Sequence, residues 1–169
     1  SQQIGAGKNP LWIFSLGEGT DISAEIYPYH KLLTVHTGRL ALTGSLKGTV
    51  LEAGESLLTP TDVPVGMAAE EDTVYTEVEI QKEDIMNNAV KAGEAFRLAD
   101  LVPYQEGRIV NMDVVHNDKM KFVVMAFDAG TGLSEHAAPG DALIFALDGE
   151  GIIGYEGQAH TLKAGEQFR

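Results

Sequence analysis

Cysteine is absent from all 169 residues of this chain. The protein therefore has no disulfide framework, no thiolate metal site and no cysteine nucleophile. Basic residues are few: 12 Lys and Arg stand against 25 Asp and Glu, which gives a formal net charge of −13. Nucleic acids and anionic membranes bind basic surfaces, so this balance argues against both as partners. It favours neutral or cationic small molecules as ligands.

Long apolar segments are missing as well. No run approaches the roughly 20 residues that a membrane-spanning helix needs. The residues that follow Ser1 show no apolar segment of the signal-peptide kind, so we expect a cytoplasmic location. Hydrophobic residues make up 44% of the chain, which is enough for the core of one domain or of two small ones.

The most informative feature that is present is an internal repeat. A shift of 111 positions aligns Trp12–Leu58 with Val123–Arg169 without a gap. The aligned pairs share residues that serve special backbone angles, among them Gly19/Gly130, Pro28/Pro139, Gly38/Gly149 and Gly54/Gly165. We therefore predict two copies of one β-unit whose strands superpose.

Short apolar segments separated by Gly and Pro predict an antiparallel β-sandwich or barrel. In the first copy the predicted strands are Leu11–Leu16, Lys31–His36, the hairpin of Arg39–Thr43 with Thr49–Leu51, Ser56–Thr59 and Thr73–Ile80. Gly17–Tyr29 is a predicted loop, and Pro60, Pro64 and Gly66 break the next segment. In the second copy they are Arg108–His116, Met120–Phe127, a buried strand over Ala142–Leu147, and the hairpin of Gly151–Tyr155 with Gln158–Leu162. The one predicted helix lies within Gln81–Gly93, where Ile85, Met86, Ala89 and Val90 share a helical face.

These elements predict an N-terminal domain over residues 1–80, a linker with a short helix over 81–98, and a C-terminal domain over 99–169. The first copy continues through Thr59–Ile80, whereas the equivalent part of the second copy would be positions 170–191. A barrel without its closing strands has a bare edge. We therefore expect that residues beyond Arg169 or a separate chain supply these strands, and we expect a homodimer or a closely paired second chain.

The segment Gly130–Gly149 resembles the first motif of the cupin family, and Lys163–Glu166 resembles the opening of its second motif. The first motif is Gly, five residues, His, one residue, His, three or four residues, Glu, six residues and Gly. Gly130, His136 and Gly149 match it, Ala138 stands at the second His, and we assign Asp141 to the Glu. The resemblance implies an all-β fold of tandem cupin jelly-roll β-barrels.

Cupins bind one divalent metal through these His and Glu side chains, and such ligands suit Fe, Mn, Ni or Zn. The resemblance thus implies His136 and Asp141 as candidate metal ligands in the second copy. In the first copy we assign the four ligand positions to Glu25, Tyr27, His30 and Val65. Valine cannot bind metal, so we expect a copy that has lost its metal. Glu25, Tyr27 and His30 then form a polar patch suited to a small hydroxylated ligand.

Two functional hypotheses follow from this resemblance. The first is a cupin-fold protein that binds a small molecule and has a sensing or regulatory role. The second is a metal-dependent cupin enzyme, a dioxygenase or an isomerase, that uses His136 together with ligands beyond Arg169. Fold analogy alone does not choose between them.

Overall fold

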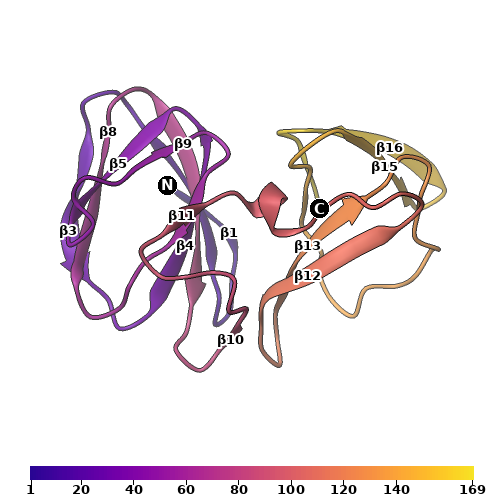
Figure 1. The fold of residues 1–169 in the computed structure, drawn as a ribbon, viewed down its shortest axis with the longest axis horizontal. Helices are drawn as coiled ribbons and strands as arrows, with labels where there is room; N and C mark the ends of the chain where they lie inside the picture. Colours follow the sequence, from indigo (N-terminus) through magenta and orange to yellow (C-terminus); the bar gives the residue numbers. More distant parts are fainter. The chain divides into compact units, whose positions relative to one another are not determined.

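A computed structural model describes all 169 residues and shows an all-β protein (Figure 1). The chain divides into two compact units. Unit 1 contains Ser1–Leu101 and Met112–Val124, and unit 2 contains Val102–Asn111 and Met125–Arg169. No helix has the length and hydrophobicity that crossing a bilayer requires.

Unit 1 is built from two antiparallel sheets that enclose a core. The larger sheet has the strand order β1 (Gln2–Gly5), β2 (Leu11–Leu16), β9 (Thr73–Ile80), β4 (His30–Thr37), β7 (Ser56–Leu58) and β11 (Ala95–Phe96). The smaller sheet has the order β3 (Asp21–Ile26), β8 (Pro64–Ala69), β5 (Arg39–Gly44) and β6 (Val50–Glu52).

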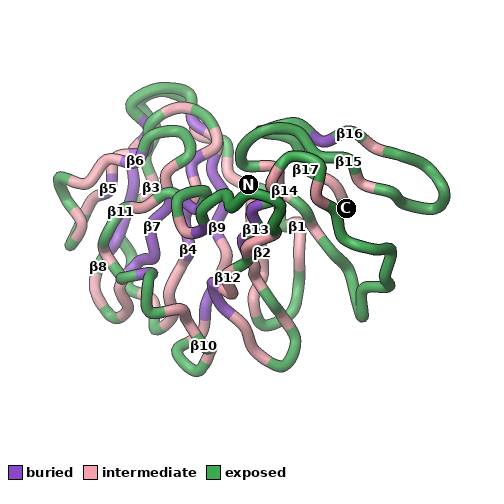
Figure 2. The backbone as a smooth tube through the Cα atoms, turned by 45° about the vertical axis from the view of Figure 1, so that its right-hand side comes forward, coloured by how far each residue is buried: buried purple, intermediate pink, exposed green.

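Both sheets contribute buried residues, purple in Figure 2, to the core of unit 1. The larger sheet supplies Leu33, Val35, Leu57 and Tyr75, and the smaller one supplies Leu40, Leu42, Leu51 and Met67, all of them almost fully buried. The strands alternate buried and exposed positions as a half-buried strand requires; Leu40 and Leu42 of β5, for example, are buried on either side of the less buried Ala41. The Tyr75 ring also stacks on Phe14, with 5.0 Å between the ring centroids.

Unit 2 contains two separate pairs of strands in addition to parts of β12 (Ile109–His116) and β13 (Lys121–Phe127). β14 (Ile144–Phe145) pairs with β17 (Gln167–Phe168), and β15 (Glu150–Tyr155) pairs with β16 (Gln158–Lys163). The corresponding strand pairs of unit 1 are β4–β7 and β5–β6. There β9 lies next to β4 and β8 lies next to β5, whereas β14 and β15 each have only one strand neighbour. Most residues of β15 and β16 are exposed (Figure 2).

Strand pairing follows the same register in both copies at an offset of 111. Leu33 pairs with Leu57, as Ile144 pairs with Phe168. The backbone contacts of the turns match in the same way: Gly54 N–H donates to the Val35 carbonyl, and Gly165 N–H donates to the Ala146 carbonyl. The backbone φ is positive in both members of three glycine pairs, Gly19/Gly130, Gly38/Gly149 and Gly54/Gly165.

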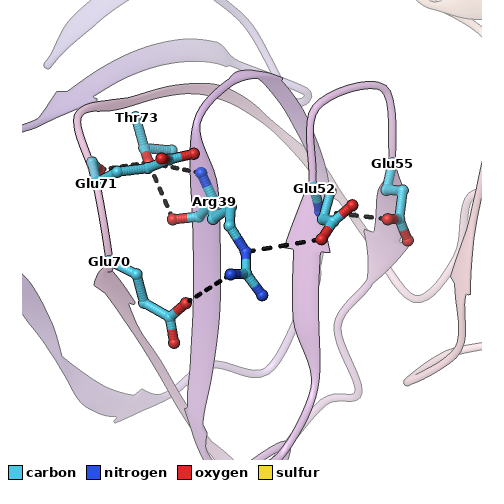
Figure 3. Close-up of polar contacts among 6 residues, drawn as sticks. All are labelled: Arg39, Glu52, Glu55, Glu70, Glu71 and Thr73. Carbon is cyan, nitrogen blue, oxygen red and sulfur yellow. Dashed lines mark hydrogen bonds and ion pairs between the residues drawn. The ribbon is translucent and has the colours of Figure 1, made fainter.

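One matched pair of positions carries opposite charges in the two copies. Arg39 on β5 pairs across the strands with Glu52 on β6, and its Nε lies 3.7 Å from Glu52 Oε1. Figure 3 shows the Arg39 guanidinium between Glu52 and Glu70. The equivalent positions in unit 2 are Glu150 and Lys163, which also pair directly across the strands. Acid and base have thus exchanged places between the copies.

Several predicted elements differ from the structure. The predicted helix over Gln81–Gly93 is wrong, because the segment forms turns around the short strand β10 (Ile85–Met86), which pairs with β12. Asp84 accepts a hydrogen bond from the Gln81 N–H, and the Asn87 side chain accepts one from the Ala89 N–H. Such local side-chain contacts compete with helix formation. The only helical segment is a 3₁₀ turn, η1 (Leu98–Leu101), at the end of the predicted linker.

Other corrections concern strands. The predicted loop Gly17–Tyr29 contains β3, and the segment broken by Pro60, Pro64 and Gly66 ends in β8. Ile22 is the only residue of β3 that is not exposed, so the sequence lacks the apolar pattern of a buried strand. The strand is defined by its pairing with β8. The predicted buried strand Ala142–Leu147 shrinks to β14, and Ile144 and Leu147 are exposed. The β12–β13 hairpin is divided between the two units, although it falls within the predicted C-terminal domain.

A polar network fastens three segments of unit 1 that are distant in sequence. The Asp84 carboxylate accepts hydrogen bonds from the side chains of Asn9 and Asn117, at 2.7 and 2.9 Å, in addition to the Gln81 N–H. The Asn117 side chain also donates to Asn9. Burial alone would raise the pKa of Asp84, but these donors outweigh it and the pKa is lowered. The network joins the residues before β2, the turn after β9 and the β12–β13 turn.

Candidate ligand-binding site

Unit 1 contains a cavity of about 110 Å³ between its two sheets. Apolar side chains from β2, β3 and β8 line one part of it: Phe14, Ile22, Val65 and Met67. The polar lining consists of Ser23, Glu25, Tyr27, Lys31 and Glu77. A smaller pocket of about 10 Å³ shares Glu25, Tyr27 and Lys31 with it and is also lined by Tyr29 and Pro60.

Strand register explains why these polar groups face each other. Glu25 on β3 pairs with Val65 on β8, so the two side chains share a face of the smaller sheet. On the larger sheet Lys31 of β4 pairs with Glu79 of β9, and Glu77 lies two residues along the same strand. Lys31 and Glu77 are therefore diagonal neighbours on the inner face, at a distance that long side chains bridge.

Lys31 and Glu77 form an ion pair that is almost completely shielded from solvent. Lys31 Nζ lies 3.6 Å from Glu77 Oε2, and the side chains are 15% and 6% exposed. The ammonium also lies 3.8 Å from the centroid of the Tyr27 ring, in a cation–π contact. Burial raises the pKa of Glu77, and the neighbouring ammonium of Lys31 offsets only part of this effect.

Glu77 is held loosely in spite of its burial. Its other carboxylate oxygen, Oε1, lies 3.5 Å from the Tyr75 hydroxyl. Charge-assisted hydrogen bonds are normally about 2.7–2.9 Å long. Both polar contacts of this carboxylate are longer than a typical charge-assisted hydrogen bond, so Glu77 has capacity to accept a closer one.

Tyr27 and Glu25 form the outer part of the polar lining. The Tyr27 hydroxyl donates a hydrogen bond to Glu25 Oε2. This hydrogen bond, with burial second, raises the pKa of Tyr27, so the phenol stays protonated. The Tyr27 ring packs near Tyr29, with 5.2 Å between the centroids. The order from the core outward is thus Tyr75, Glu77, Lys31, Tyr27 and Glu25.

Comparison with known proteins gives the architecture a family. The structure is similar to a cupin 2 conserved barrel domain protein from Leptotrichia buccalis, with a TM-score of 0.83 and 26% sequence identity. The match covers 98% of this chain and 75% of the other. The chain belongs to the cupin superfamily. A cupin superfamily protein from Desulfitobacterium hafniense matches over 48% of this chain and 75% of its own, with 16% identity and a TM-score of 0.45. No protein-family model and no curated protein matches the sequence.

The cupin motif places the cavity at the metal-binding positions of the fold. In unit 1 these positions are Glu25 on β3, Tyr27 just after the end of β3, Val65 on β8 and the acidic position on β4. We predicted His30 for the acidic position, but six residues before Gly38 leave Lys31 there. The structure agrees with this correction: Lys31 lines the cavity. His30 does not, because its Nδ1 lies 2.6 Å from the Thr59 carbonyl oxygen.

The residues at these positions do not fit a metal. Val65 offers no ligand atom, and the ammonium of Lys31 repels a cation and has no lone pair to donate. Glu25 is the single good oxygen ligand of the four. Across all 169 residues, no group of three or more His, Asp or Glu side chains could hold a metal ion.

The candidate metal ligands of unit 2 have separate partners. His136 is exposed and its Nδ1 lies 2.9 Å from the Ser134 carbonyl oxygen, within a segment that has no regular structure. Asp141 is also exposed, and its Oδ2 lies 3.4 Å from Arg169 Nη2. Six residues before Gly149 leave Ala142, not Asp141, at the acidic position of the motif. Metal binding by His136 and Asp141 stays a prediction.

Sequence reasoning identified Glu25, Tyr27 and Val65 of this site but missed Lys31 and Glu77. A signal for Lys31 was present in the spacing to Gly38. A signal for Glu77 was present as well. Glu77 is two residues from Tyr75 on the same strand, so the two side chains face the same side. An acidic side chain at an inward position is rarely buried without a partner or a ligand.

Proposed function

We propose that unit 1 binds a small hydroxylated molecule in its barrel cavity, as a binding or sensing module. The observation that carries this proposal is the shared lining of Glu25, Tyr27, Lys31 and Glu77 around about 110 Å³. Drug-sized ligands occupy pockets of about 300–1,000 Å³. The cavity therefore suits a molecule of few heavy atoms.

Charge and chemistry of the lining support a neutral, hydroxyl-bearing ligand. Two carboxylates and one ammonium face the cavity, so a carboxylate ligand meets net repulsion. Carboxylates accept hydrogen bonds from hydroxyl groups, and the Lys31 ammonium donates to hydroxyl oxygens. Phe14, Val65 and Met67 offer apolar contact for the carbon skeleton of such a ligand. This combination of a few polar groups and an apolar wall is typical of ligand sites.

We also propose that the chain is a tandem cupin with one ligand-binding copy. The common strand registers and positive-φ glycines at an offset of 111 support this organisation. Unit 2 has the strand pairs β14–β17 and β15–β16, whereas residues of unit 1 line the cavity described above. Homodimer formation stays a prediction, and sedimentation at micromolar concentration tests it.

A ligand screen with a blocked-cavity variant tests the binding function. Small polyols, sugars and amino alcohols are added to the full chain, and changes in backbone amide NMR shifts are recorded. We expect changes at residues that line the cavity, and we expect Val65→Phe to remove them by filling the space. Ile26→Phe is the matched control, because Ile26 lies on β3 with 64% of its surface exposed. Ligands that act equally on both variants, or none that acts at all, would contradict the proposal.

A further inference from the structure

The Lys31 ammonium is the only cationic group that lines the cavity, and its position is fixed from two sides. Glu77 Oε2 lies 3.6 Å away, and the Tyr27 ring covers it at 3.8 Å. A lysine normally keeps its ammonium in water. Here the side chain is 15% exposed, so the charge is held inside the barrel.

The same ammonium stands at the acidic position of the metal-binding motif of the fold. In a metal-binding cupin this part of the barrel holds a positive charge in the form of an ion. In unit 1 the Lys31 ammonium places a positive charge there, 3.6 Å from the Glu77 carboxylate, and Glu25 lines the same cavity. The difference between the motif and this lining therefore has an electrostatic interpretation. The positive charge that a metal ion supplies in a metal-binding cupin is supplied here by the Lys31 ammonium.

We propose that the Lys31–Glu77 ion pair is the ligand-binding element of the unit 1 cavity, with Lys31 as a permanent cation in place of a bound metal and a ligand hydroxyl bridging the pair. This inference rests on the proposed small-molecule function and names the groups that recognise the ligand. The hydroxyl oxygen accepts a hydrogen bond from Lys31 Nζ, and its proton is donated to Glu77 Oε2. One hydroxyl thus satisfies both charges.

The geometry of the pair suits such a bridge. The separation of 3.6 Å between Nζ and Oε2 is too long for a strong direct hydrogen bond, and the Glu77–Tyr75 contact is long too. A hydroxyl oxygen beside the pair can lie at hydrogen-bond distance, about 2.8 Å, from both Nζ and Oε2 without a change in their 3.6 Å separation. Because the pair is shielded from water, hydrogen bonds to its charged groups are stronger than they would be at the surface.

The test uses meso-erythritol as the neutral polyol probe, with acetate as the anionic and ethylammonium as the cationic comparison, neither of which carries a hydroxyl. The full chain is titrated in the presence of a chelator, and the backbone amide shifts of Lys31, Val65 and Glu77 report binding. We compare the unmodified protein with Lys31→Met/Glu77→Gln, which removes both charges together and leaves no buried charge unpaired. Lys82→Met is the matched control, because Lys82 pairs with Asp62 at the surface.

We expect erythritol to bind with chelator present and the double variant to weaken binding about tenfold or more, as hydrogen bonds to charged groups require. Lys82→Met leaves the affinity unchanged. Equal binding by the double variant, or binding that needs an added divalent metal, overturns the inference. If only acetate or ethylammonium shifts these amides, the hydroxyl bridge is wrong while the cavity remains a binding site. If none of the three probes shifts them, both proposals fail.

Discussion

Gly38 connects β4 to β5 at a point where the backbone leaves no room for a side chain. Its φ is 84°, in the left-handed region that favours glycine. A Cβ added there would lie 2.8 Å from Thr73 Cα and closer still to the Asp72 carbonyl oxygen. For Gly38→Ala we expect a loss of about 1–2 kcal/mol from the backbone angle and a further 1–3 kcal/mol from the clash. The total is about 3 kcal/mol.

Gly149 is the equivalent residue of the second copy and provides a matched comparison. Its φ is 72°, but a Cβ added there meets no atom within 4 Å. Gly149→Ala should therefore cost only the backbone angle, about 1–2 kcal/mol. The difference between the two variants isolates the contact with the β8–β9 turn, which unit 1 contains and unit 2 does not.

Urea denaturation followed by tryptophan fluorescence measures the first effect, because the only tryptophan, Trp12, lies on β2 in unit 1. Gly38→Ala should lower the midpoint of the Trp12 transition without changing its slope. Backbone amide NMR at residues of β15 and β16 reports the effect of Gly149→Ala on unit 2. Equal losses of stability in the two variants, or a larger loss for Gly149→Ala, would refute this reasoning.

Three further predictions concern the carboxyl groups of Glu77 and Asp84 and metal binding by His136. Since burial raises the folded-state pKa of Glu77, its favourable contribution is complete below the unfolded pKa of about 4.3. That contribution is lost as pH rises through the folded pKa. The stability of Glu77→Gln relative to the unmodified protein should therefore rise from about pH 4 to pH 7, which urea denaturation at the two pH values measures. A difference in urea midpoint between the two proteins that stays constant or falls over this range would contradict the prediction. Asp84→Ala should cost about 2 kcal/mol or more through three lost hydrogen bonds to a charged group. Because the pKa of Asp84 is lowered, this cost should shrink as pH falls below about 4, and thermal unfolding at pH 7 and pH 3 checks it. For the metal prediction, elemental analysis after incubation with Fe, Mn, Ni or Zn should find less than about a tenth of an equivalent, because a transition-metal site needs about three protein ligands. A higher content that His136→Ala removes, and that His116→Ala or His160→Ala leaves in place, would instead assign the metal to His136.

The repeat and the turn residues made most of the unit 1 fold predictable from sequence. Leu11–Leu16 and Thr73–Ile80 match β2 and β9 residue for residue, because each is rich in aromatic and β-branched or other apolar residues and is bounded by a Gly or by charged turn residues. β3 escaped prediction since its side chains are mostly exposed and its pairing with β8 is a long-range property. The sequence around β3 does not indicate which distant strand will pair with it.

The candidate site was predictable in position but not in chemistry. The cupin motif located Glu25, Tyr27 and Val65 around one point of the barrel, and the structure places all three in the lining. What the motif could not express is the diagonal contact of Lys31 with Glu77, which depends on the register between β4 and β9. The one-residue difference between His30 and Lys31 decides which side chain points inward, because strand neighbours face opposite sides.

The exchanged charges of Arg39/Glu52 and Glu150/Lys163 have a consequence for how the chain folds. Two similar hairpins in one polypeptide can exchange strands during folding, and such misassembly is a known hazard of repeats. If β5 paired with β16, Arg39 would face Lys163, and if β15 paired with β6, Glu150 would face Glu52. Both mispaired ladders place like charges directly opposite each other, which is destabilising. The charge pairs thus favour strand pairing within each copy over pairing between the copies.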